Sequence, residues 1–137
     1  MEQNKTHHNN SLKQIPDGAV QHITAGPYSP LLIIDPGKLV VLSGQAAIDH
    51  DGHIVGDNIE EQTEYMLQNC SRLLAQAGCS MDDVFKATVY LKSIADWSAF
   101  NTIYKNYFKE PLPVRTAIQT GLIGELLVEI EIWAIKA

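Results

Sequence analysis

Two acidic side chains interrupt an otherwise apolar stretch near the C-terminus. The stretch LLVEIEIWAI, residues 126–135, has the composition of a β-strand but carries Glu129 and Glu131. Residues two apart point to the same side of a strand, so both carboxylates share one face with Trp133, while the opposite face is wholly apolar. The mixed face either lies in solvent or lines a cavity or subunit contact, where Glu129 would relay a proton or hold a water molecule. Glu131 is interpreted as a structural residue or an ion-pair partner.

Arg115 is the candidate anion-binding residue, because it follows two prolines at the start of an expected strand. Its planar guanidinium matches a carboxylate through two parallel hydrogen bonds, but an arginine here could equally be a solvated charge that protects a sheet edge. Tyr28, in the loop AGPYSP, either packs against the protein or offers its hydroxyl to a ligand. Gly44 ends another expected strand, where the missing Cβ permits a bulge or the close approach of a ligand.

Motifs for other common chemistries are missing from the sequence. It lacks the G-x-G-x-x-G, Walker, H-E-x-x-H and G-x-S-x-G patterns. The adjacent His7 and His8 lie in a polar N-terminal stretch and are not interpreted as a metal site. Cys70 and Cys79 are expected to be buried thiols rather than a disulfide or a metal-binding pair. An enzyme with this sequence is therefore expected to use neither a metal nor a cofactor.

Length and composition narrow the class of protein. A chain of 137 residues with 45% hydrophobic residues is long enough for one domain with a real core. The formal net charge of −6, without a basic cluster, disfavours nucleic acid as the main partner. No apolar run reaches the roughly 18 residues that span a membrane, and the polar N-terminus lacks the apolar core of a signal peptide. A cytoplasmic protein without membrane attachment is expected.

Hydrophobic periodicity and turn residues predict alternating strands and helices. The first expected element is a hairpin over 31–45 with a type II turn at Pro36-Gly37. A helix over 57–77 follows, with an Asp57/Glu60 capping box and Gly78 as its C-terminal cap. The remaining elements are a strand over 83–91, a helix after Asp96 that ends before Pro111, and strands over 114–120 and 126–135.

This order of elements predicts an α+β fold. We expect a two-layer sandwich in which two helices cover one face of a mixed β-sheet. The other face would stay open, and its mixed character suggests contact with other subunits. Residues 1–12 are expected to be a disordered polar tail, and residues 13–137 a single domain.

Six segments, in this order along the chain, resemble the Rid/YjgF family of reactive-intermediate (enamine/imine) deaminases. They are GPYSP, LVVLSGQ, IVGDNIEEQTEYMLQN, DVFKATVYLKSIADWSAFNTIYKNYF, PVRTAI and LVEIEIWAI, and the resemblance extends from Ala25 to Lys136. It implies a chorismate-mutase-like fold and a homotrimer with active sites in clefts between subunits. A neighbouring subunit would then cover the face that carries Glu129.

The resemblance also implies roles for individual residues. Arg115 would grip the substrate carboxylate, and Glu129 and Tyr28 would complete the catalytic group. The substrate-binding residues implied are Ser43, Gly44, Asn101, Thr116 and Ala117. Two positions depart from the family pattern, because Pro30 replaces a common glutamine and Ala117 a cysteine found in some members. These changes leave the substrate range open.

The expected activity is hydrolysis of small 2-imino or enamine acids to 2-keto acids and ammonia. Such intermediates are released by pyridoxal-phosphate dehydratases that act on serine or threonine. One alternative is a specialised deaminase of a catabolic intermediate, such as an aminomuconate or aminoacrylate. Another is a trimer that binds a small ligand without catalysis. A ribonuclease or translation inhibitor is also compatible with the resemblance but is disfavoured by the net charge of −6.

Overall fold

The computed structural model describes residues 10–137, so the first nine residues of the expected tail lie outside it. Its strands are β1 (Lys13–Gln14), β2 (Ile33–Ile34), β3 (Lys38–Val41), β4 (Gln45–Ala46), β5 (Val84–Leu91), β6 (Val114–Gln119) and β7 (Val128–Lys136). Its α-helices are α1 (Ile59–Gln76) and α2 (Trp97–Tyr104), and three short 3₁₀ turns are η1 (Met81–Asp83), η2 (Ile94–Asp96) and η3 (Lys105–Tyr107).

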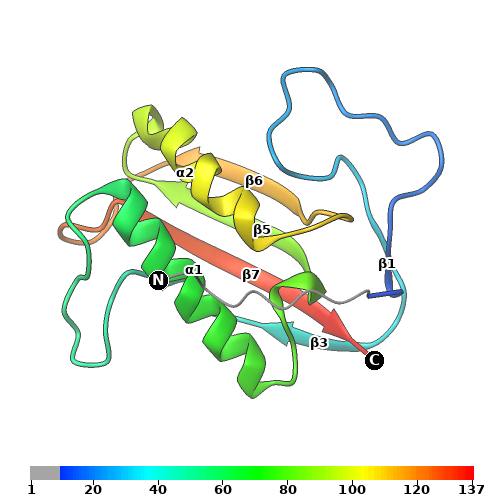
Figure 1. Cartoon of the computed structure of the whole chain (residues 1–137), viewed down its shortest axis with the longest axis horizontal. Coiled ribbons are helices and arrows are strands. Elements are labelled where there is room, and N and C mark those ends of the chain that lie inside the picture. The colour runs from blue at the N-terminus through cyan, green and yellow to red at the C-terminus, as the bar shows by residue number, and fades with distance from the viewer. Residues whose placement is uncertain (1–9) are drawn as a thin grey trace.

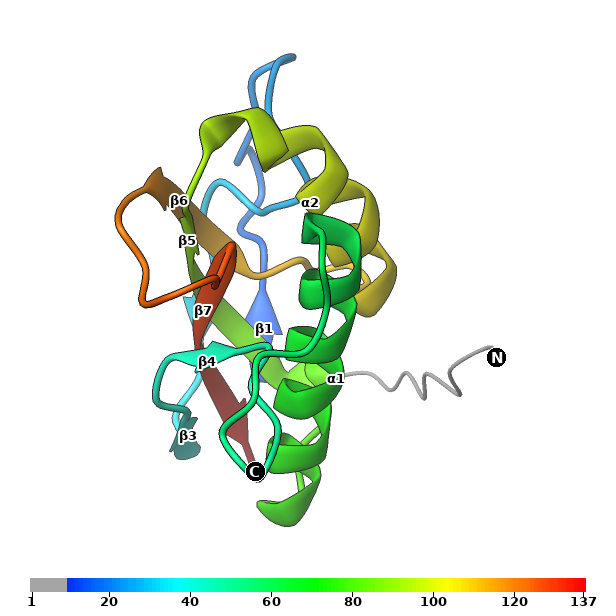
Figure 2. The same ribbon diagram turned by 90° about the vertical axis from the view of Figure 1, so that its left-hand side faces the viewer.

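The main sheet is mixed, with strand order β3-β7-β5-β6 and β4 paired beside β3 along β7. Strand β7 is antiparallel to β3, β4 and β5, whereas β5 and β6 are parallel. A parallel pair needs a crossover connection, and α2 provides it. Both helices lie on the same side of the sheet (Figures 1 and 2), which confirms the expected α+β sandwich with two helices on one face.

The alternation of β7 separates a core face from an open face. Val128, Ile130, Ile132 and Ala134 are fully buried under the helices. Glu129, Glu131 and Trp133 alternate with them and are half-buried on the other side. The neighbouring strands add exposed apolar side chains to the open face, namely Leu39, Val41 and Ile118.

The start of α1 corrects the expected capping box by one residue. Asn58, not Asp57, is the N-cap, and its side chain accepts a hydrogen bond from the backbone N–H of Glu61. The Glu61 carboxylate in turn accepts from the backbone N–H of Asp57. When the helix begins at Ile59, the Ile59 side chain is buried in the core. This burial favours Asn58 over Asp57 as the capping residue. Gly78 caps the other end with φ +74°, as expected.

The expected hairpin over 31–45 is wrong in its pairing. Strand β2 pairs with β1 in a separate two-stranded sheet, and β3 pairs with β7. Gly37 has no positive φ, so the expected type II turn is absent here. Instead, Gly37 passes close to β7, where an added Cβ would lie 2.4 Å from the carbonyl oxygen of Lys136. Apolar alternation predicted both strands, but it carries no information about their partners.

The first described residues are tied to the main domain. Asn10 Nδ2 donates to Asp83 Oδ1 (2.8 Å) and to the carbonyl of Ile135 (3.0 Å). Lys13 is buried, and its Nζ donates to the carbonyl of Asp82 (3.0 Å). Burial lowers the pKa of Lys13 to about 8. Residues 10–12 of the expected tail are therefore held in place by side-chain contacts.

Two further expectations concern the thiols and the membrane. Cys70 and Cys79 are both free and buried, as expected, and burial raises the pKa of Cys70 to about 12. Within residues 10–137, neither helix combines the length and apolar character that crossing a bilayer requires.

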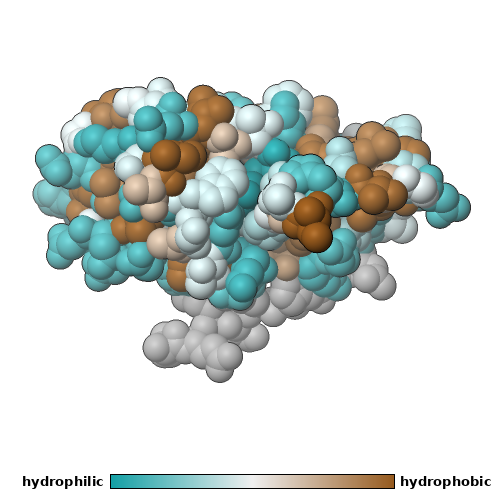
Figure 3. Space-filling view, turned by 90° about the horizontal axis from the view of Figure 1, so that it is seen from above, coloured by the Kyte–Doolittle hydropathy of each residue, from teal (hydrophilic) through white to brown (hydrophobic). Residues whose placement is uncertain are grey.

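Seen from above, the surface carries apolar side chains scattered among polar ones (Figure 3).

The close passage of Gly37 predicts the cost of a methyl group there. Replacing Gly37 with alanine should lower the free energy of unfolding by about 1–3 kcal/mol, because a backbone oxygen of the central strand must move away. Denaturant unfolding at one fixed protein concentration measures the change. Gly121→Ala is the matched control, since no atom lies within 4 Å of its Cβ position. Equal stability of the two variants would contradict the contact.

Candidate functional site

Arg115 on β6 points into the helix layer of the sandwich. It lies opposite the buried Ala87 in the parallel β5–β6 ladder, so the two side chains share a face. Its Nη1 donates to the Oδ1 of Asn101 on α2 (2.8 Å). Four aromatic rings surround the Arg115 Cζ, with centroids at 4.8 Å for Tyr104, 5.1 Å for Trp97, 5.2 Å for Tyr28 and 5.8 Å for Phe100.

The guanidinium of Arg115 is a half-buried cation, and the part of the chain that the structure describes gives it no counter-ion. Within residues 10–137, no carboxylate lies at ion-pair distance from it. Burial lowers the pKa of Arg115, although a guanidinium stays protonated at any physiological pH. Its Nη2 is buried and has no hydrogen-bond partner among the described residues. Buried polar groups are normally paired, so an Nη2 without a partner is unusual, and a carboxylate would match its charge.

The loop before β2 brings Tyr28 to this site. Ser29 is buried, and its backbone N–H and hydroxyl donate to the carbonyls of Pro113 and Leu112, directly before β6. These bonds hold the preceding residues over Arg115. An added Cβ at Gly26 would lie 3.1 Å from Arg115 Nη2, so the loop backbone covers this nitrogen closely. The loop is therefore part of the group of residues around Arg115, and Tyr28 contributes its ring to the cage.

Glu129 belongs to a second group of residues on the open face. An added Cβ at Gly44 would lie 2.6 Å from Glu129 Oε2, so a glycine is what allows the chain to pass the carboxylate. Ser43 and Gly44 form a β-bulge, because the pairing with β7 shifts by one residue between Val41 and Gln45. Bulges of this kind are common beside functional sites, where they redirect a short stretch of backbone.

One chain does not bring Arg115 and Glu129 together. Ala87 shares a face with Arg115, whereas Tyr90, on the opposite side of β5, shares one with Glu129. Tyr28 and Asn101 contact Arg115, and Ala117 lies two residues along on the same face. Ser43 and Gly44 lie in the bulge beside Glu129, and Thr116 is exposed on the open face. The expected site residues thus form two half-sites on opposite faces of one sheet.

Three members of the aromatic cage were not expected as site residues. Trp97, Phe100 and Tyr104 repeat at helical spacing, which by itself indicates only the inner side of a helix. Gly26 was also missed. The available signal was the pairing of this aromatic stripe with an arginine that enters the same layer, but only the tertiary structure shows that they meet.

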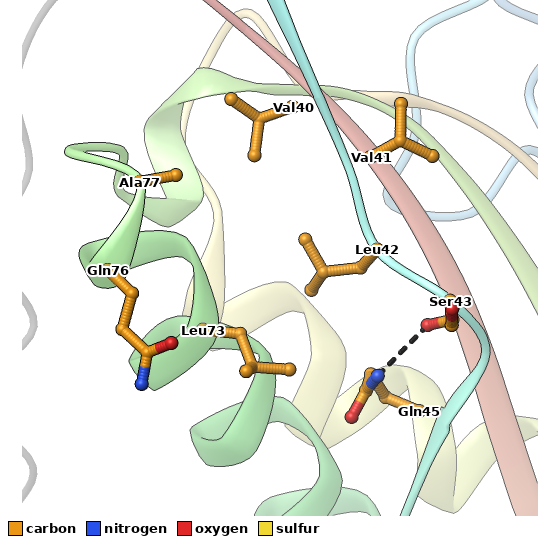
Figure 4. A pocket seen from close by; sticks show the side chains of 8 residues that line it. All are labelled: Val40, Val41, Leu42, Ser43, Gln45, Leu73, Gln76 and Ala77. Carbon is orange, nitrogen blue, oxygen red and sulfur yellow. Dashed lines mark hydrogen bonds between the residues drawn. The ribbon is translucent and has the colours of Figure 1, made fainter.

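A separate hollow of about 420 Å³ lies between β3 and the C-terminal half of α1 (Figure 4). Its lining residues are Val40, Val41, Leu42, Ser43, Gln45, Leu73, Gln76 and Ala77. It touches the second half-site only through Ser43, and neither Arg115 nor Glu129 lines it. Most of its wall is aliphatic, so it adds no chemistry of its own to the half-sites.

Asp49, Asp51 and His53 bring possible metal-ligand atoms within 4.8 Å of one another in the turn after β4. Hydrogen bonds of the turn account for this arrangement, because Asp49 Oδ1 accepts from the backbone N–H groups of Asp51 and His53. The same bonds, that from His53 foremost, lower the pKa of Asp49. Asp51 and His53 are exposed, so the group is explained by the local turn.

Fold and site together define a small α+β protein in which a half-buried arginine lies within a cage of aromatic rings. A family model described as Endoribonuclease L-PSP matches residues 19–136. A RutC family protein of Pyrococcus abyssi is 39% identical over 113 residues, which cover 81% of this chain and 87% of the relative. The 2-iminobutanoate/2-iminopropanoate deaminase of Homo sapiens is 36% identical, covering 81% of each chain. The chain belongs to the Rid/YjgF family.

Solved structures agree with this assignment. The Rid-family protein YyfA of Yersinia pestis matches with a TM-score of 0.68 and 36% identity, covering 82% of this chain and 90% of that one. A member of the YjgF/YER057c/UK114 family from Mycobacterium tuberculosis matches with a TM-score of 0.65 and 32% identity, covering 80% of this chain and 86% of that one. The mixed sheet with two helices is therefore the family fold.

The unpaired Nη2 of Arg115 predicts a small effect on stability. Arg115→Met should change the free energy of unfolding by less than about 1 kcal/mol, because removal of a buried N–H without an acceptor offsets the loss of the bond to Asn101 and of the contacts with the rings. Denaturant unfolding measures this, with Lys86→Met as control. Lys86 is an exposed cation over the ring of Trp133, and its loss should change stability by less than about 0.5 kcal/mol. A loss above about 2 kcal/mol in Arg115→Met would instead make the guanidinium a structural support.

Proposed function

We propose that the protein is a cofactor-independent deaminase that hydrolyses small 2-imino or enamine acids to 2-keto acids and ammonia. The observation that carries the proposal is the half-buried Arg115, held by Asn101 and four aromatic rings, whose Nη2 has no hydrogen-bond partner among the described residues. Relatives in Homo sapiens and Capra hircus, which are 36% and 37% identical in sequence, are named 2-iminobutanoate/2-iminopropanoate deaminases. Their named substrates are small acids with one carboxylate, which suits a single clamp.

The proposed mechanism needs one clamp and one proton-transfer group. Arg115 holds the substrate carboxylate, which places the imine carbon next to a water molecule. Glu129 accepts a proton from this water as its oxygen adds to the C=N carbon, and it returns a proton to the nitrogen. As the C–N bond of the resulting carbinolamine breaks, Glu129 passes the hydroxyl proton to the nitrogen, so that ammonia leaves and the C=O bond of the 2-keto acid forms. Imines already hydrolyse in water, so a modest lowering of the barrier is enough, at about 1.4 kcal/mol for each tenfold gain.

The mechanism requires Glu129 from a second copy of the chain, because the two half-sites lie on opposite faces. We propose a homotrimer in which each chain gives its Arg115 half to one site and its Glu129 half to another. A closed ring of three identical contacts forms three complete sites in this way. The exposed apolar residues of the open face, Leu39, Val41 and Ile118, support a contact there.

The physiological substrate within this class depends on the rim of the site. Ala117 is half-buried near Arg115, and Pro30 follows the Ser29 anchor and is exposed. A specialised catabolic deaminase, acting on an aminomuconate or aminoacrylate, would use the same clamp with a different rim. We place the protein in the cytoplasm, although a Schizosaccharomyces pombe relative, 33% identical, is named a mitochondrial protein.

Imine turnover is the direct test of this function. We expect the native protein to accelerate keto-acid formation from 2-iminopropionate and 2-iminobutyrate, generated in place by a dehydratase with a competing trap. Arg115→Ala should lower kcat/KM by about 100-fold or more, because it removes the charged partner of the carboxylate. Glu129→Gln should lower kcat by about 100-fold through loss of proton transfer.

Lys105→Ala serves as the control for this assay, since it removes an exposed cation on η3, away from the open face. It should retain native turnover. Absence of acceleration by folded native protein would refute imine deamination. Tight carboxylate binding without turnover would instead favour a ligand-binding trimer.

Mixing two inactive variants tests whether the site lies between subunits. Arg115→Ala and Glu129→Gln, unfolded together in equal amounts and refolded, should recover about a quarter of native activity. About three quarters of randomly mixed trimers hold both variants, and each of these has one intact site in three. The same variants refolded separately provide the baseline. Absence of recovery in verified mixed trimers would place both groups in one subunit's site, contrary to the proposal.

A further inference from the structure

A chain of side-chain hydrogen bonds joins helix α1 to the bulge beside Glu129. Arg72 Nη2 donates to Asn69 Oδ1 (3.0 Å), and Asn69 Nδ2 donates to Gln45 Oε1 (2.7 Å). Gln45 Nε2 then donates to the backbone carbonyl of Ser43 (3.1 Å), the bond drawn in Figure 4. Only Arg72 is fully exposed among the three side chains, while Asn69 and Gln45 are half-buried. We call these four residues the α1–bulge relay.

The direction of each amide in the relay is determined by the charge at its end. A guanidinium can only donate hydrogen bonds, so Asn69 must turn its oxygen toward Arg72 and its nitrogen toward Gln45. Gln45 must then present its oxygen to Asn69, which leaves its nitrogen for the carbonyl of Ser43. Each group therefore has one orientation in which all three bonds form.

The relay ends at Ser43, next to the glycine that lies against Glu129. Gln45 pairs with Ile130 and turns its side chain to the helix layer, where it meets Asn69. The preceding Gly44 lies against Glu129 on the open face, with its Cβ position 2.6 Å from Oε2. Bulge residues fall outside the regular ladder, so the Gln45–Ser43 bond supplies a contact that the strand pairing does not. A small shift of this bulge would move the backbone that limits the Glu129 carboxylate.

We propose that Asn69 and Gln45 are positioning residues that hold the Ser43–Gly44 bulge and thereby the carboxylate of Glu129. Neither residue touches the substrate, and both act through the bulge. The catalytic consequence rests on the proposed deaminase function. The positional consequence does not, because it concerns only the geometry of Gly44 and Glu129.

Asn69→Asp tests the relay with minimal change of shape. Aspartate offers no donor to Gln45, so the Gln45 amide must turn and place its oxygen against the carbonyl of Ser43. We expect kcat for imine hydrolysis to fall about tenfold with KM changed less than about twofold, because Arg115 and its cage are untouched. The backbone amide resonance of Gly44 should shift or broaden in the substrate-free protein.

Asn106→Asp is the matched control, since Asn106 is an exposed residue of η3 that donates one bond to the carbonyl of Thr102. It should alter neither kcat nor the Gly44 resonance. Thermal unfolding of both variants separates a local effect from loss of fold. If Asn69→Asp does not fold, Arg72→Met replaces it, because this variant removes only the exposed end of the relay. It should lower kcat about threefold and broaden Gly44, because both amides can then turn.

The outcomes separate the two proposals. One outcome is that the native protein hydrolyses imines while Asn69→Asp changes neither kcat nor the Gly44 resonance. This outcome would overturn the relay and leave the deaminase function intact. A fall in kcat accompanied by an equal rise in KM would also overturn it, because that result places the effect on carboxylate binding. If the native protein does not hydrolyse imines, the proposed function fails alone. The Gly44 resonance then decides the relay, which an unchanged resonance in Asn69→Asp would overturn.

Discussion

Strand β7 meets two different surroundings at once, and this constraint organises the rest of the protein. Ile130 and Ile132 supply the centre of the core beneath the helices, while Glu129 and Glu131 face away from it. Strand β7 pairs on one side with β3 and β4 and on the other with β5, which carries β6. The alignment of β7 with these strands therefore determines where both edges of the sheet lie. One edge delivers the bulge to Glu129, and the other carries Arg115. Neither half-site could shift without a change in the β7 ladder.

The chemistry of the two half-sites follows from unequal solvation. Arg115 is enclosed by aromatic rings, whose faces attract the cation but provide no hydrogen-bond acceptor for Nη2. Its charge therefore interacts strongly with any carboxylate that reaches it, since little water competes. Glu129 lies on a half-exposed face and contacts the backbone of a bulge. In the proposed mechanism, Arg115 holds the substrate on one side and water reaches Glu129 on the other, as a hydrolysis requires.

The sequence was most informative where the relevant physics is local. Alternation in residues 126–135 predicted both faces of β7, and helical spacing predicted α1 to within two residues at its start. The one-residue error at the cap arose because Asp57 and Asn58 are both good caps, and burial of Ile59 decides between them. The false hairpin at Gly37 has a different cause, since strand partners depend on contacts distant in sequence.

The candidate site was predictable in its residue types but not in its geometry. Arg115, Asn101 and Tyr28 meet as the family resemblance implied, whereas the aromatic cage comes from a helix stripe that looked like ordinary core. Arg115 and Glu129 lie on opposite faces because of how β5 is aligned with β6 and with β7. The sequence alone does not give this strand register. Close approaches at Gly26 and Gly44 likewise involve side chains far away in the sequence.

The small β1–β2 sheet sets a limit on how far the chain can be shortened. Lys13 and Gln14 pair with Ile34 and Ile33, and so they close the base of the loop that carries Tyr28. The buried Lys13 and the contacts of Asn10 attach that base to η1 and to the end of β7. Trimming or proteolysis beyond residue 13 would thus turn a closed loop into a free end. Protease sensitivity at the N-terminus and loss of order around Arg115 should therefore appear together, because the β1–β2 pairing holds both segments in place.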